Sequence, residues 1–452
     1  IHKELTMSIR HLDKLFAPGS VAVFGASERA GRVGTTVWRN LHGPYTGRLY
    51  PVNPKHRTLD GVKAYASVKA LPEAPDLAVI CTPADTVVKL IAQLGERGTR
   101  AAIVVTAGLD PATRQAMLDA ARVHTLRILG PNCIGLLVPH LGLNASFAHI
   151  GAQPGDLAFV SQSGALVTAM LDWAAARGIG FSHFVSLGEH ADVDFGDLLD
   201  HLGSDPHTRG ILLYIESIDE SRKFMSAARA AARNKPVIVV KAGRSAAGQA
   251  AAASHTGALA GSAAVFAAAI ARAGMLRVLT LPDLFLAAET LARFRDGPSE
   301  RLIVLTNGGG AGVLAADEAA ALGVPLAPLD DAMRARLDAV LPANWSHANP
   351  VDIIGDAPTE RYVAALDALA HDTASAVLFI HAPTAIVPSA DIAQAEVEAL
   401  PGDRVHAVRR IADQRQPRRD GTRQTQQAHQ GLAGRLAQQQ DRQAVQQVHV
   451  SV

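Results

Sequence analysis

Short apolar runs alternate with Ala- and Leu-rich stretches along most of this chain, and this alternation constrains its fold more than any other feature. Val21–Phe24, Leu77–Ile80 and Ile211–Ile215 are examples of the apolar runs. A stretch of helical pattern follows each of them. Such alternation is typical of parallel strands that are joined by helices and covered by helices on both faces. It predicts an α/β fold with parallel sheets.

The length of 452 residues predicts about three domains. We expect an extension at 1–6, a first domain at 7–147, a second at 150–295, a third at 299–400 and a tail at 401–452. The strands that support these domains are expected at 21–24, 49–52, 77–80, 102–105, 127–129, 155–160, 181–185, 210–215, 236–240, 302–305 and 376–380.

The tail at 401–452 is rich in Arg, Gln and His, and the alternation of strands and helices stops there. Such a segment has too few apolar side chains to offset the entropy lost on ordering, which predicts disorder or a poorly specified helix. A frame-shifted reading of a GC-rich gene would give the same composition, and nucleic-acid binding by the basic residues is a further alternative.

Composition argues against several classes of function. The chain has a formal net charge of +1 and 4% aromatic residues, so it lacks the charge and the stacking surface typical of nucleic-acid binding. No apolar run reaches the roughly 18 residues of a membrane-spanning helix. The two cysteines, Cys81 and Cys133, are too few for a disulfide framework, and no Cys/His spacing typical of a metal site occurs. We therefore expect a cytoplasmic protein without a bound metal, which interacts with neither nucleic acid nor membrane.

A glycine-rich turn follows the first predicted strand and leads into a helix. Gly25, Ala26, Ser27 and Gly34 belong to it, and the backbone amides of such a turn suit an anionic phosphate. The spacing differs from G-x-G-x-x-G, so a purely structural turn is an alternative. NAD-binding domains carry an acidic residue after the second strand, whereas this chain has Lys55 there. This favours a phosphorylated adenosine such as coenzyme A over NAD.

Polar or turn-forming residues follow three later strands of the first domain. They are Thr82 and Pro83, Thr106, and Asn132. Each alone is an ordinary loop, but the carboxyl ends of parallel strands meet at one edge of a sheet, where α/β proteins bind ligands. The three loops are therefore predicted to surround one crevice.

Two further turns, one in the second domain and one in the third, lie between a strand and a helix. Each could be only a tight turn, or its free amides and the helix dipole could hold a phosphoryl group. Two such helices aimed at one group would hold it without a metal. The candidate phosphate-binding residues are Ser161, Ser163, Gly164, Gly309, Gly310 and Ala311.

A single histidine, His255, lies among small residues in the connection between the strand at 236–240 and a long Ala-rich helical run. It could accept a phosphoryl group, or it could be an ordinary loop or capping histidine. Glu216 follows the strand at 210–215. Its carboxylate could hold one imidazole nitrogen so that the other is nucleophilic, or it could form a surface ion pair.

Together these motifs resemble those of the NDP-forming acyl-CoA synthetases, relatives of succinyl-CoA synthetase, and in particular the alpha subunits of ADP-forming acetyl-CoA synthetases. The resemblance implies an N-terminal Rossmann-like CoA-binding domain followed by two flavodoxin-like, succinyl-CoA-ligase-like domains, the second of them incomplete in this chain. The motifs that carry it are Gly25-Ala26-Ser27, Val52-Asn53-Pro54-Lys55, Gly130-Pro131-Asn132-Cys133, Ser161-Gln162-Ser163-Gly164, Ser254-His255-Thr256-Gly257, Thr306-Asn307-Gly308-Gly309-Gly310-Ala311-Gly312 and Asn349-Pro350-Val351-Asp352.

The resemblance also implies roles for single residues. His255 would be phosphorylated during turnover, Glu216 would support it, and the turns at 161–164 and 308–312 would stabilise the phosphohistidine. The residues that would line the CoA site are Gly25, Ala26, Ser27, Gly34, Lys55, Thr82, Pro83, Thr106 and Asn132.

The implied activity interconverts acyl-CoA, phosphate and ADP with a carboxylic acid, CoA and ATP, through an acyl phosphate and a phosphohistidine. Members of the family bind ADP or ATP with Mg in an ATP-grasp domain, and nothing in this sequence resembles one. We therefore expect a separate ATP-grasp subunit or a missing fused domain, within a homo- or hetero-oligomer. The alternatives are a non-catalytic CoA-binding regulatory module and a subunit related to protein acetyltransferases, and the presence of His255 counts against both.

Overall fold

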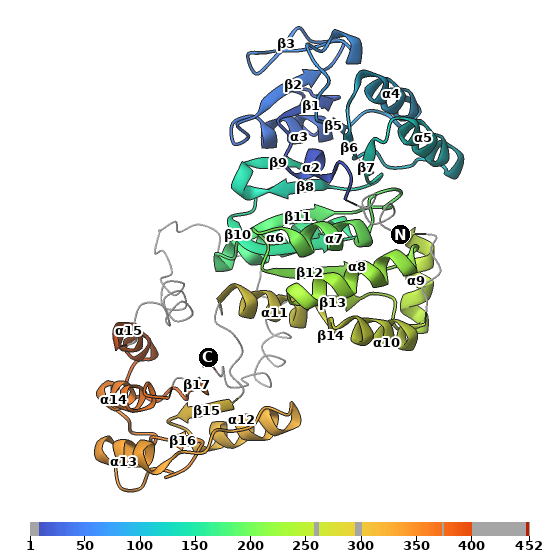
Figure 1. Ribbon diagram of the computed structural model, residues 1–452. Helices are drawn as coiled ribbons and strands as arrows, with labels where there is room; N and C mark the ends of the chain where they lie inside the picture. The colour runs from blue at the N-terminus through green and yellow to red at the C-terminus, as the bar shows by residue number, and fades with distance from the viewer. Residues whose placement is uncertain (1–8, 257–261, 294–300, 373–374, 400–448, 452) are drawn as a thin grey trace, which may run out of the picture. The chain divides into compact units, whose positions relative to one another are not determined.

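The computed structural model describes residues 9–256, 262–293, 301–372, 375–399 and 449–451 (Figure 1). The chain forms two compact units, Ile1–Ala292 and Arg293–Val452. The expected extension at 1–6 and residues 401–448 of the expected tail lie outside the described part of the chain.

The first unit begins with a five-stranded parallel sheet in the order β2-β1-β5-β6-β7. Its strands are β1 (Ser20–Phe24), β2 (Arg48–Val52), β5 (Leu77–Ile80), β6 (Ala101–Val104) and β7 (Arg127–Leu129). The other elements of this part are α2 (Leu12–Phe16), α3 (Val33–Leu41), β3 (Thr58–Leu59), β4 (Val62–Lys63), η1 (Val68–Ala70), α4 (Ala84–Arg97) and α5 (Pro111–Val123). All five strands lie where the sequence predicts strands.

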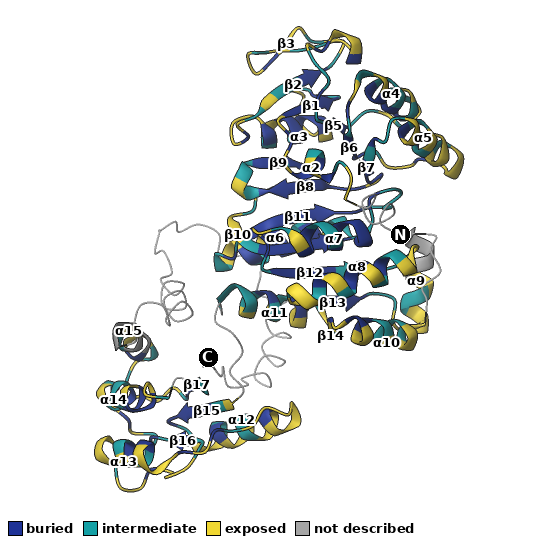
Figure 2. Ribbon diagram, in the orientation of Figure 1, coloured by how far each residue is buried: buried dark blue, intermediate teal, exposed yellow. Residues whose placement is uncertain are grey.

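The central strands of this sheet are buried on both faces. Every residue of β1, β5 and β6 is buried, and apolar residues dominate all three strands. Figure 2 shows buried strands between helices whose outer faces are exposed. Uninterrupted apolar runs are typical of parallel strands that helices cover on both sides. The polar residues that follow these strands are therefore collected at the carboxyl edge of the sheet.

The first unit continues with a seven-stranded sheet in the order β14-β13-β12-β10-β11-β8-β9. Its strands are β8 (Gly135–Val138), β9 (Leu143–Ser146), β10 (Pro154–Ser161), β11 (Phe181–Ser186), β12 (Gly210–Ile215), β13 (Val237–Lys241) and β14 (Leu276–Val278). Its helices are η2 (Pro139–Leu141), α6 (Gly164–Arg177), α7 (Phe195–Ser204), α8 (Ser221–Asn234), α9 (Ala246–Thr256), α10 (Ala263–Ala273) and α11 (Leu281–Arg293).

The hairpin of β8 and β9 belongs to the second sheet. Leu137 of β8 pairs with Phe184 of β11 in antiparallel register. The hairpin also contacts the first sheet's layer, because Asn40 of α3 donates hydrogen bonds of 2.9 Å to the carbonyls of Ser146 and Ala148. These two strands are absent from the strands expected from the sequence, and their residues lie within the expected first domain. The hairpin therefore joins the two sheets of this unit.

A buried ionic cluster also connects the two sheets. Arg127 of β7 forms ion pairs with Asp192 (Nε–Oδ2 3.0 Å) and with Asp197 of α7 (Nη2–Oδ2 2.9 Å). The Asp197 side chain is fully buried, and Lys223 of α8 lies 2.7 Å from the same oxygen. Removing one partner of a buried ion pair leaves an uncompensated charge, at a cost of about 3–5 kcal/mol. This cluster therefore fixes the first sheet against the helices of the second.

The second unit contains a four-stranded sheet in the order β16-β15-β17-β18, in which β18 alone is antiparallel to its neighbour. Its strands are β15 (Arg301–Thr306), β16 (Val351–Asp352), β17 (Ser375–His381) and β18 (His449–Ser451). Its helices are α12 (Gly309–Ala321), α13 (Asp331–Val340), α14 (Thr359–Leu369) and α15 (Ser389–Ala399). Three sheets built mainly from parallel strands confirm the predicted α/β fold.

Candidate active site

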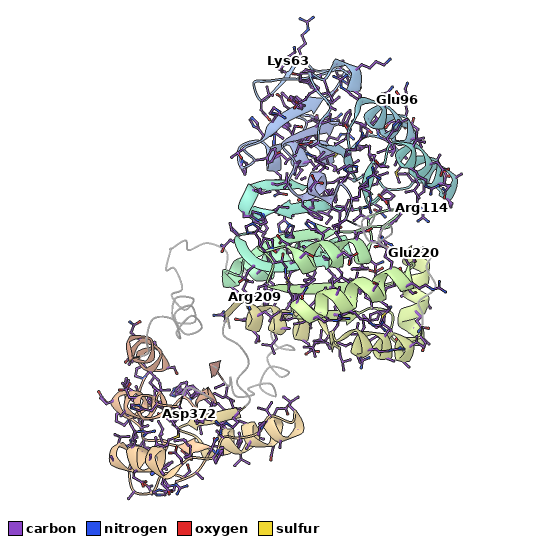
Figure 3. The ribbon with its side chains drawn as sticks, in the orientation of Figure 1. Lys63, Glu96, Arg114, Arg209, Glu220 and Asp372 are labelled. Carbon is purple, nitrogen blue, oxygen red and sulfur yellow. The ribbon has the colours of Figure 1, made fainter. Side chains whose placement is uncertain are left out.

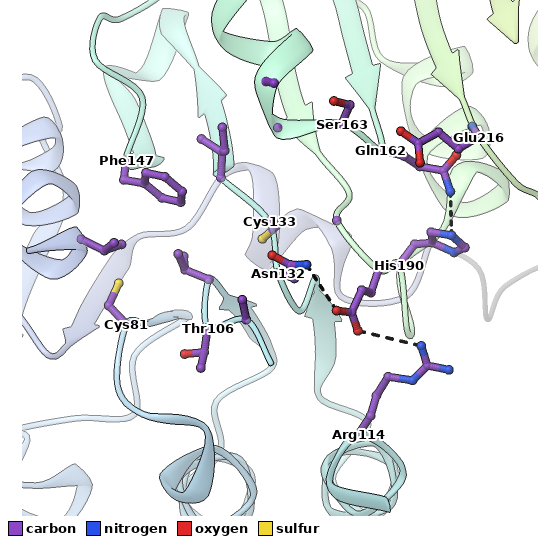
Figure 4. A pocket seen from close by; sticks show the side chains of 18 of the residues that line it. Cys81, Thr106, Arg114, Asn132, Cys133, Phe147, Gln162, Ser163, His190 and Glu216 are labelled. Atoms are coloured by element: carbon purple, nitrogen blue, oxygen red, sulfur yellow. Dashed lines mark hydrogen bonds and ion pairs between the residues drawn. The ribbon is translucent and has the colours of Figure 1, made fainter. Parts of the chain in front are cut away.

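Loops from both sheets of the first unit meet around a cleft of about 860 Å³. The first sheet contributes the loops after β5, β6 and β7, and the second contributes those after β10, β11 and β12 (Figure 4). Each of these strands delivers its following loop to the carboxyl edge of a parallel sheet, which is where α/β proteins bind ligands. The cleft thus collects six loops that are far apart in the sequence, and Val33, Arg114 and Phe147 complete its wall.

Three of the residues predicted to bind CoA, Thr82, Thr106 and Asn132, line this cleft. The Thr106 hydroxyl donates to the Thr82 carbonyl (2.7 Å), and the Asn132 amide donates to the Thr106 carbonyl (3.0 Å). Asn132 has a φ of 55°, in the left-handed region that asparagine tolerates better than most residues. The three loops that the sequence predicts around one crevice are therefore joined to one another by hydrogen bonds.

The glycine-rich turn after β1 packs against the same loops without forming the wall of the cleft. Gly25 has a φ of 86°, and a Cβ there would lie 2.9 Å from the Cys81 carbonyl oxygen. A Cβ on Gly34 would lie 2.1 Å from the Gly25 carbonyl oxygen. Only glycine permits such an approach, so α3 begins directly on the turn. Val33, the first residue of α3, lines the cleft.

The other predicted CoA ligands surround this turn. The carbonyl of buried Ala26 accepts from Asn53 Nδ2 (2.8 Å), and Asn53 Oδ1 accepts from the backbone amide of Lys55 (3.0 Å). Lys55 is exposed, so its backbone is tied to the turn while its side chain faces solvent. The hydroxyl of Ser27 accepts a hydrogen bond within the turn, and Pro83 directly precedes α4. The structure thus groups these residues beside the cleft rather than in its wall.

On the second sheet, Ser163 and Gly164 line the cleft at the N-terminus of α6. The Ser161 hydroxyl donates to the Ser163 carbonyl (2.9 Å) and accepts from the Ser163 amide (3.0 Å). Ser161 is buried and lies outside the cleft wall, so its hydroxyl shapes the turn. The helix that follows presents its positive end to the cleft, as an anion site requires.

Glu216 lines the cleft directly after β12. Its backbone amide donates to Gln162 Oε1, and its carbonyl accepts from Nζ of buried Lys241 (2.7 Å). Burial lowers the pKa of Lys241, and Glu216 opposes this shift. Burial and the nearby Glu216 carboxylate together raise the pKa of Tyr214 to about 12. Glu216 is therefore held by its backbone on both sides while its carboxylate borders the cleft.

Three residues that are not among the predicted site residues also line the cleft: Arg114, Glu189 and His190. Arg114 lies on α5 (Figure 3), and its Nη1 is 4.0 Å from Glu189 Oε2. Asn132 Nδ2 donates to the other oxygen of Glu189 (3.4 Å). Glu189 and His190 follow β11 closely, so the rule that identifies Thr106 after β6 would have found them. Arg114 occupies a helix surface and gives no comparable signal.

Cys81 and Cys133 also line the cleft, and burial raises the pKa of each thiol to about 12. Both thiols are therefore neutral near pH 7 and act as small apolar wall residues. Within the described residues, no group of three or more His, Cys, Asp or Glu side chains could hold a metal ion.

His255 lies in the last turn of α9, and its side chain is outside the described part of the chain. The expected connecting loop is wrong at this position, because the backbone of His255 is helical. The reason is local, because the Ser245 hydroxyl accepts from the Gly248 amide (3.1 Å) and an Ala-rich run of high helix propensity follows. The helix therefore extends to Thr256.

The turn at 306–308 in the second unit repeats the construction of the turn at 161–163. The Thr306 hydroxyl accepts from the Gly308 amide (3.0 Å) and donates to the Gly308 carbonyl (3.3 Å). The hydroxyl on the last residue of each strand thus makes the same pair of bonds to the residue two positions later. The two turns that the sequence marks as phosphate sites share one geometry.

The predicted phosphate residues of the second unit, Gly309, Gly310 and Ala311, form the first turn of α12. Gly309 and Gly310 are exposed. A Cβ on Gly309 would lie 2.9 Å from Asp352 Oδ2, whereas one on Gly310 would contact nothing within 4 Å. This helix therefore presents an open N-terminus with one carboxylate beside it.

Two known families match the two sheets of the first unit. The family described as CoA binding domain matches residues 19–139, and the one described as succinyl-CoA ligase like flavodoxin domain matches residues 154–291. Within the described residues, no helix combines the length and the apolar content needed to cross a membrane. The fold and the cleft thus define an α/β protein with a CoA-binding domain and a ligase-type flavodoxin domain.

Full-length comparisons are more specific. The chain is similar to acetate–CoA ligase [ADP-forming] I of Archaeoglobus fulgidus, with 40% identity over 381 residues, 83% of this chain and 55% of that protein. It is similar to the alpha subunit of acetate–CoA ligase [ADP-forming] I of Pyrococcus furiosus, with 38% identity over 397 residues and 85% of each chain covered. A solved structure of acetyl-coenzyme A synthetase 1 from Ca. Korarchaeum cryptofilum, in complex with phosphate and ADP, matches with a TM-score of 0.83 and 37% identity. That match covers 86% of this chain and 85% of the other.

The chain belongs to the ADP-forming acyl-CoA synthetase family, which confirms the resemblance seen in its motifs. It spans about half of the longer relative, 55% of the Archaeoglobus protein, and most of the alpha subunit from Pyrococcus.

Proposed function

We propose that this chain is the part of an ADP-forming acyl-CoA ligase that binds CoA and carries the phosphorylated histidine. The observation that supports it most is the shared cleft. It brings Thr82, Thr106 and Asn132 of the expected CoA site together with Gly164 of the expected phosphate site and with Glu216, the expected partner of His255. An acyl thioester and a phosphate must be held next to each other to react, and one cleft that receives both meets this requirement.

In the proposed reaction, an oxygen of phosphate attacks the acyl carbon of acyl-CoA. The carbon–sulfur bond breaks, CoA leaves as the thiol, and an acyl phosphate remains. A ring nitrogen of His255 then attacks the phosphorus, the bond to the acyl oxygen breaks, and the carboxylic acid leaves as its anion. Phosphohistidine finally transfers its phosphoryl group to ADP and gives ATP. A covalent carrier divides one difficult transfer into two easier steps.

The proposed roles follow from where the residues lie. Ser163 and Gly164, at the start of α6, suit the phosphate because the helix presents its positive end there. Glu216 would orient the His255 imidazole and keep its second nitrogen nucleophilic. The start of α12 would serve as a second anion site for the phosphohistidine. The glycine turn with Ser27 and Lys55 would hold the phosphates of CoA.

The partners are proposals as well. ADP or ATP with Mg would bind to an ATP-grasp subunit or domain outside this sequence, within a homo- or hetero-oligomer, and two similar relatives are alpha subunits. The acyl substrate would be a small carboxylic acid or its CoA thioester. We also propose the division into domains at 7–147, 150–295 and 299–400, in which the hairpin of β8 and β9 extends from the first domain into the sheet of the second. We propose a cytoplasmic location as well, for which the unpaired Cys81 and Cys133 argue.

The test is phosphorylation of the chain by its own substrates. Purified chain is mixed with labelled phosphate and a panel of acyl-CoAs that includes acetyl-CoA, and acid-labile label is located by peptide mapping. We expect label on His255, release of an equal amount of free thiol, and no label in His255→Asn. Absence of label with every acyl-CoA, in a chain that binds CoA, would favour the regulatory module instead. Addition of an ATP-grasp subunit with ADP should remove the label as ATP.

A further inference from the structure

The Gln162 carboxamide uses all of its hydrogen-bonding capacity in the wall of the cleft (Figure 4). Its Oε1 accepts from the backbone amides of Glu216 (2.5 Å) and Ser217 (3.0 Å). Its Nε2 lies 3.2 Å from Ser217 Oγ and 2.7 Å from His190 Nε2. Two backbone N–H donors face the oxygen. If the carboxamide were flipped, its NH2 group would face these two donors and no hydrogen bond could form. Its orientation is therefore fixed.

This orientation determines the state of the His190 ring. Because Gln162 Nε2 is a donor, His190 Nε2 must accept and carries no proton. The neutral ring then holds its proton on Nδ1, which lies 3.6 Å from Asp219 Oδ2. The His190 side chain is only 8% exposed, so water does not readily replace these partners.

The charged side chains in the cleft wall around the ring come from α5 and from the loops after β11 and β12. Asp219 lies before α8, Glu216 follows β12, and Glu189 is the neighbour of the ring in the loop after β11. The cations are Arg114, which is paired with Glu189, and Lys241, which is bonded to the Glu216 carbonyl. The hydrogen bond from Gln162 Nε2 is what fixes His190 Nε2 as an acceptor.

We propose that His190 is a positioning residue for phosphoryl transfer, which acts in its neutral form through Gln162. Gln162 lies between Ser161 and Ser163 in the chain, and its side chain binds the backbone of Glu216. A displaced Gln162 side chain would therefore move the turn at 161–164 relative to Glu216. Protonation of His190 Nε2 would place an N–H against the Gln162 amide and cause this displacement. This inference rests on the proposed function of the cleft.

The first test exchanges donors and acceptors. The lysine of His190→Lys presents only hydrogen-bond donors to Gln162. A misplacement of about 1 Å can lower a reaction rate by about 100-fold, so we expect the labelling of His255 at pH 8 to slow by about that factor. Adding Gln162→Glu replaces the opposing amide with an acceptor whose oxygens can still accept from the Glu216 and Ser217 amides. The double variant should therefore recover about tenfold of the loss, since contacting residues are not additive.

A matched control separates positioning from general damage. His149 also contacts a carboxylate, Asp172, at 2.7 Å, but lies outside the cleft wall, so His149→Lys should label at the rate of the unchanged chain. Equal rates in His190→Lys and the unchanged chain would overturn the proposal.

A second measurement does not depend on activity. Long-range ¹⁵N–¹H correlation spectra of histidine-labelled protein, assigned by comparison with His190→Asn, report which ring nitrogen carries the proton. We expect the Nδ1–H form at pH 8, and a ring protonated on Nε2 would overturn the inference even if the lysine variant failed to fold. If no acyl-CoA labels the unchanged chain, the proposed function fails and the positioning role fails with it. The spectra still decide the state of the ring.

Discussion

Replacing Gly34 with alanine tests whether the close approach of α3 to the glycine turn supports CoA binding. The new Cβ would lie 2.1 Å from the Gly25 carbonyl oxygen, 1.3 Å short of the 3.4 Å at which ordinary contact begins. Both partners are part of the backbone, so no side chain can rotate away. Such overpacking costs about 1–3 kcal/mol of the free energy of unfolding.

The new Cβ would also push α3 away from the glycine turn, and this displacement should weaken the binding of CoA. A hydrogen bond that spans 2.7–3.2 Å is lost when its donor moves by more than about 1 Å, and each bond to a charged group contributes about 1.5–3 kcal/mol. Because 1.4 kcal/mol corresponds to a factor of ten, Gly34→Ala should raise the Kd for CoA by about 10- to 100-fold.

Isothermal titration with CoA and urea unfolding measure the two effects separately. Gly31→Ala is the matched control, since it lies in the same turn and its Cβ would meet nothing within 4 Å. Its φ of 76° should cost about 1–2 kcal/mol of stability without moving α3. The reasoning is refuted if Gly34→Ala binds CoA as tightly as the unchanged chain, or if the control weakens binding to the same degree.

Three further predictions concern the second sheet of the first unit. Glu216→Gln should slow single-turnover labelling of His255 by about 100-fold, and labelling at the original rate would exclude the assigned role. Lys241→Met leaves the part-buried carbonyls of Glu216 and Ala242 without their donor, so urea titration should show a loss of about 1 kcal/mol. Burial lowers the pKa of His183 from 6.5 to about 3, so below pH 6.5 the unfolded chain takes up a proton that the folded chain does not. As the pH is lowered from 6.5 to 4.5, the free energy of unfolding of the unchanged chain should therefore decrease more steeply than that of His183→Gln, by up to about 1.4 kcal/mol per pH unit. Equal slopes for the two proteins over this range would contradict the prediction.

Local sequence patterns were sufficient for most strands of the fold. The runs that became β1, β5 and β12 are apolar, end in polar or turn-forming residues, and require no knowledge of distant contacts. The hairpin of β8 and β9 depends on a partner far along the chain, because Leu137 pairs with Phe184. A short apolar run at 135–138 is compatible with either sheet, and only tertiary packing decides between them.

The residues of the cleft also divide into those that local sequence patterns predict and those that only tertiary packing brings there. Thr82, Thr106 and Asn132 could be predicted together because each follows a strand of one parallel sheet. Arg114 could not, since its place beside Glu189 results from how α5 packs against a loop of the other sheet. The helical backbone at His255 was missed because alanine propensity in α9 outweighed the small residues that suggest a loop.

The ionic cluster around Arg127 and the hairpin of β8 and β9 have a consequence for recombination between relatives. A crossover placed between β9 and β10, in the gap between the two matched families, would separate both the hairpin from β11 and Arg127 from Asp197. Chimeras should therefore remain folded only when one parent supplies the hairpin together with its β11 partner, and Arg127 together with Asp197. The two domains of the first unit are thus inherited as a single exchangeable block, although they match two separate families.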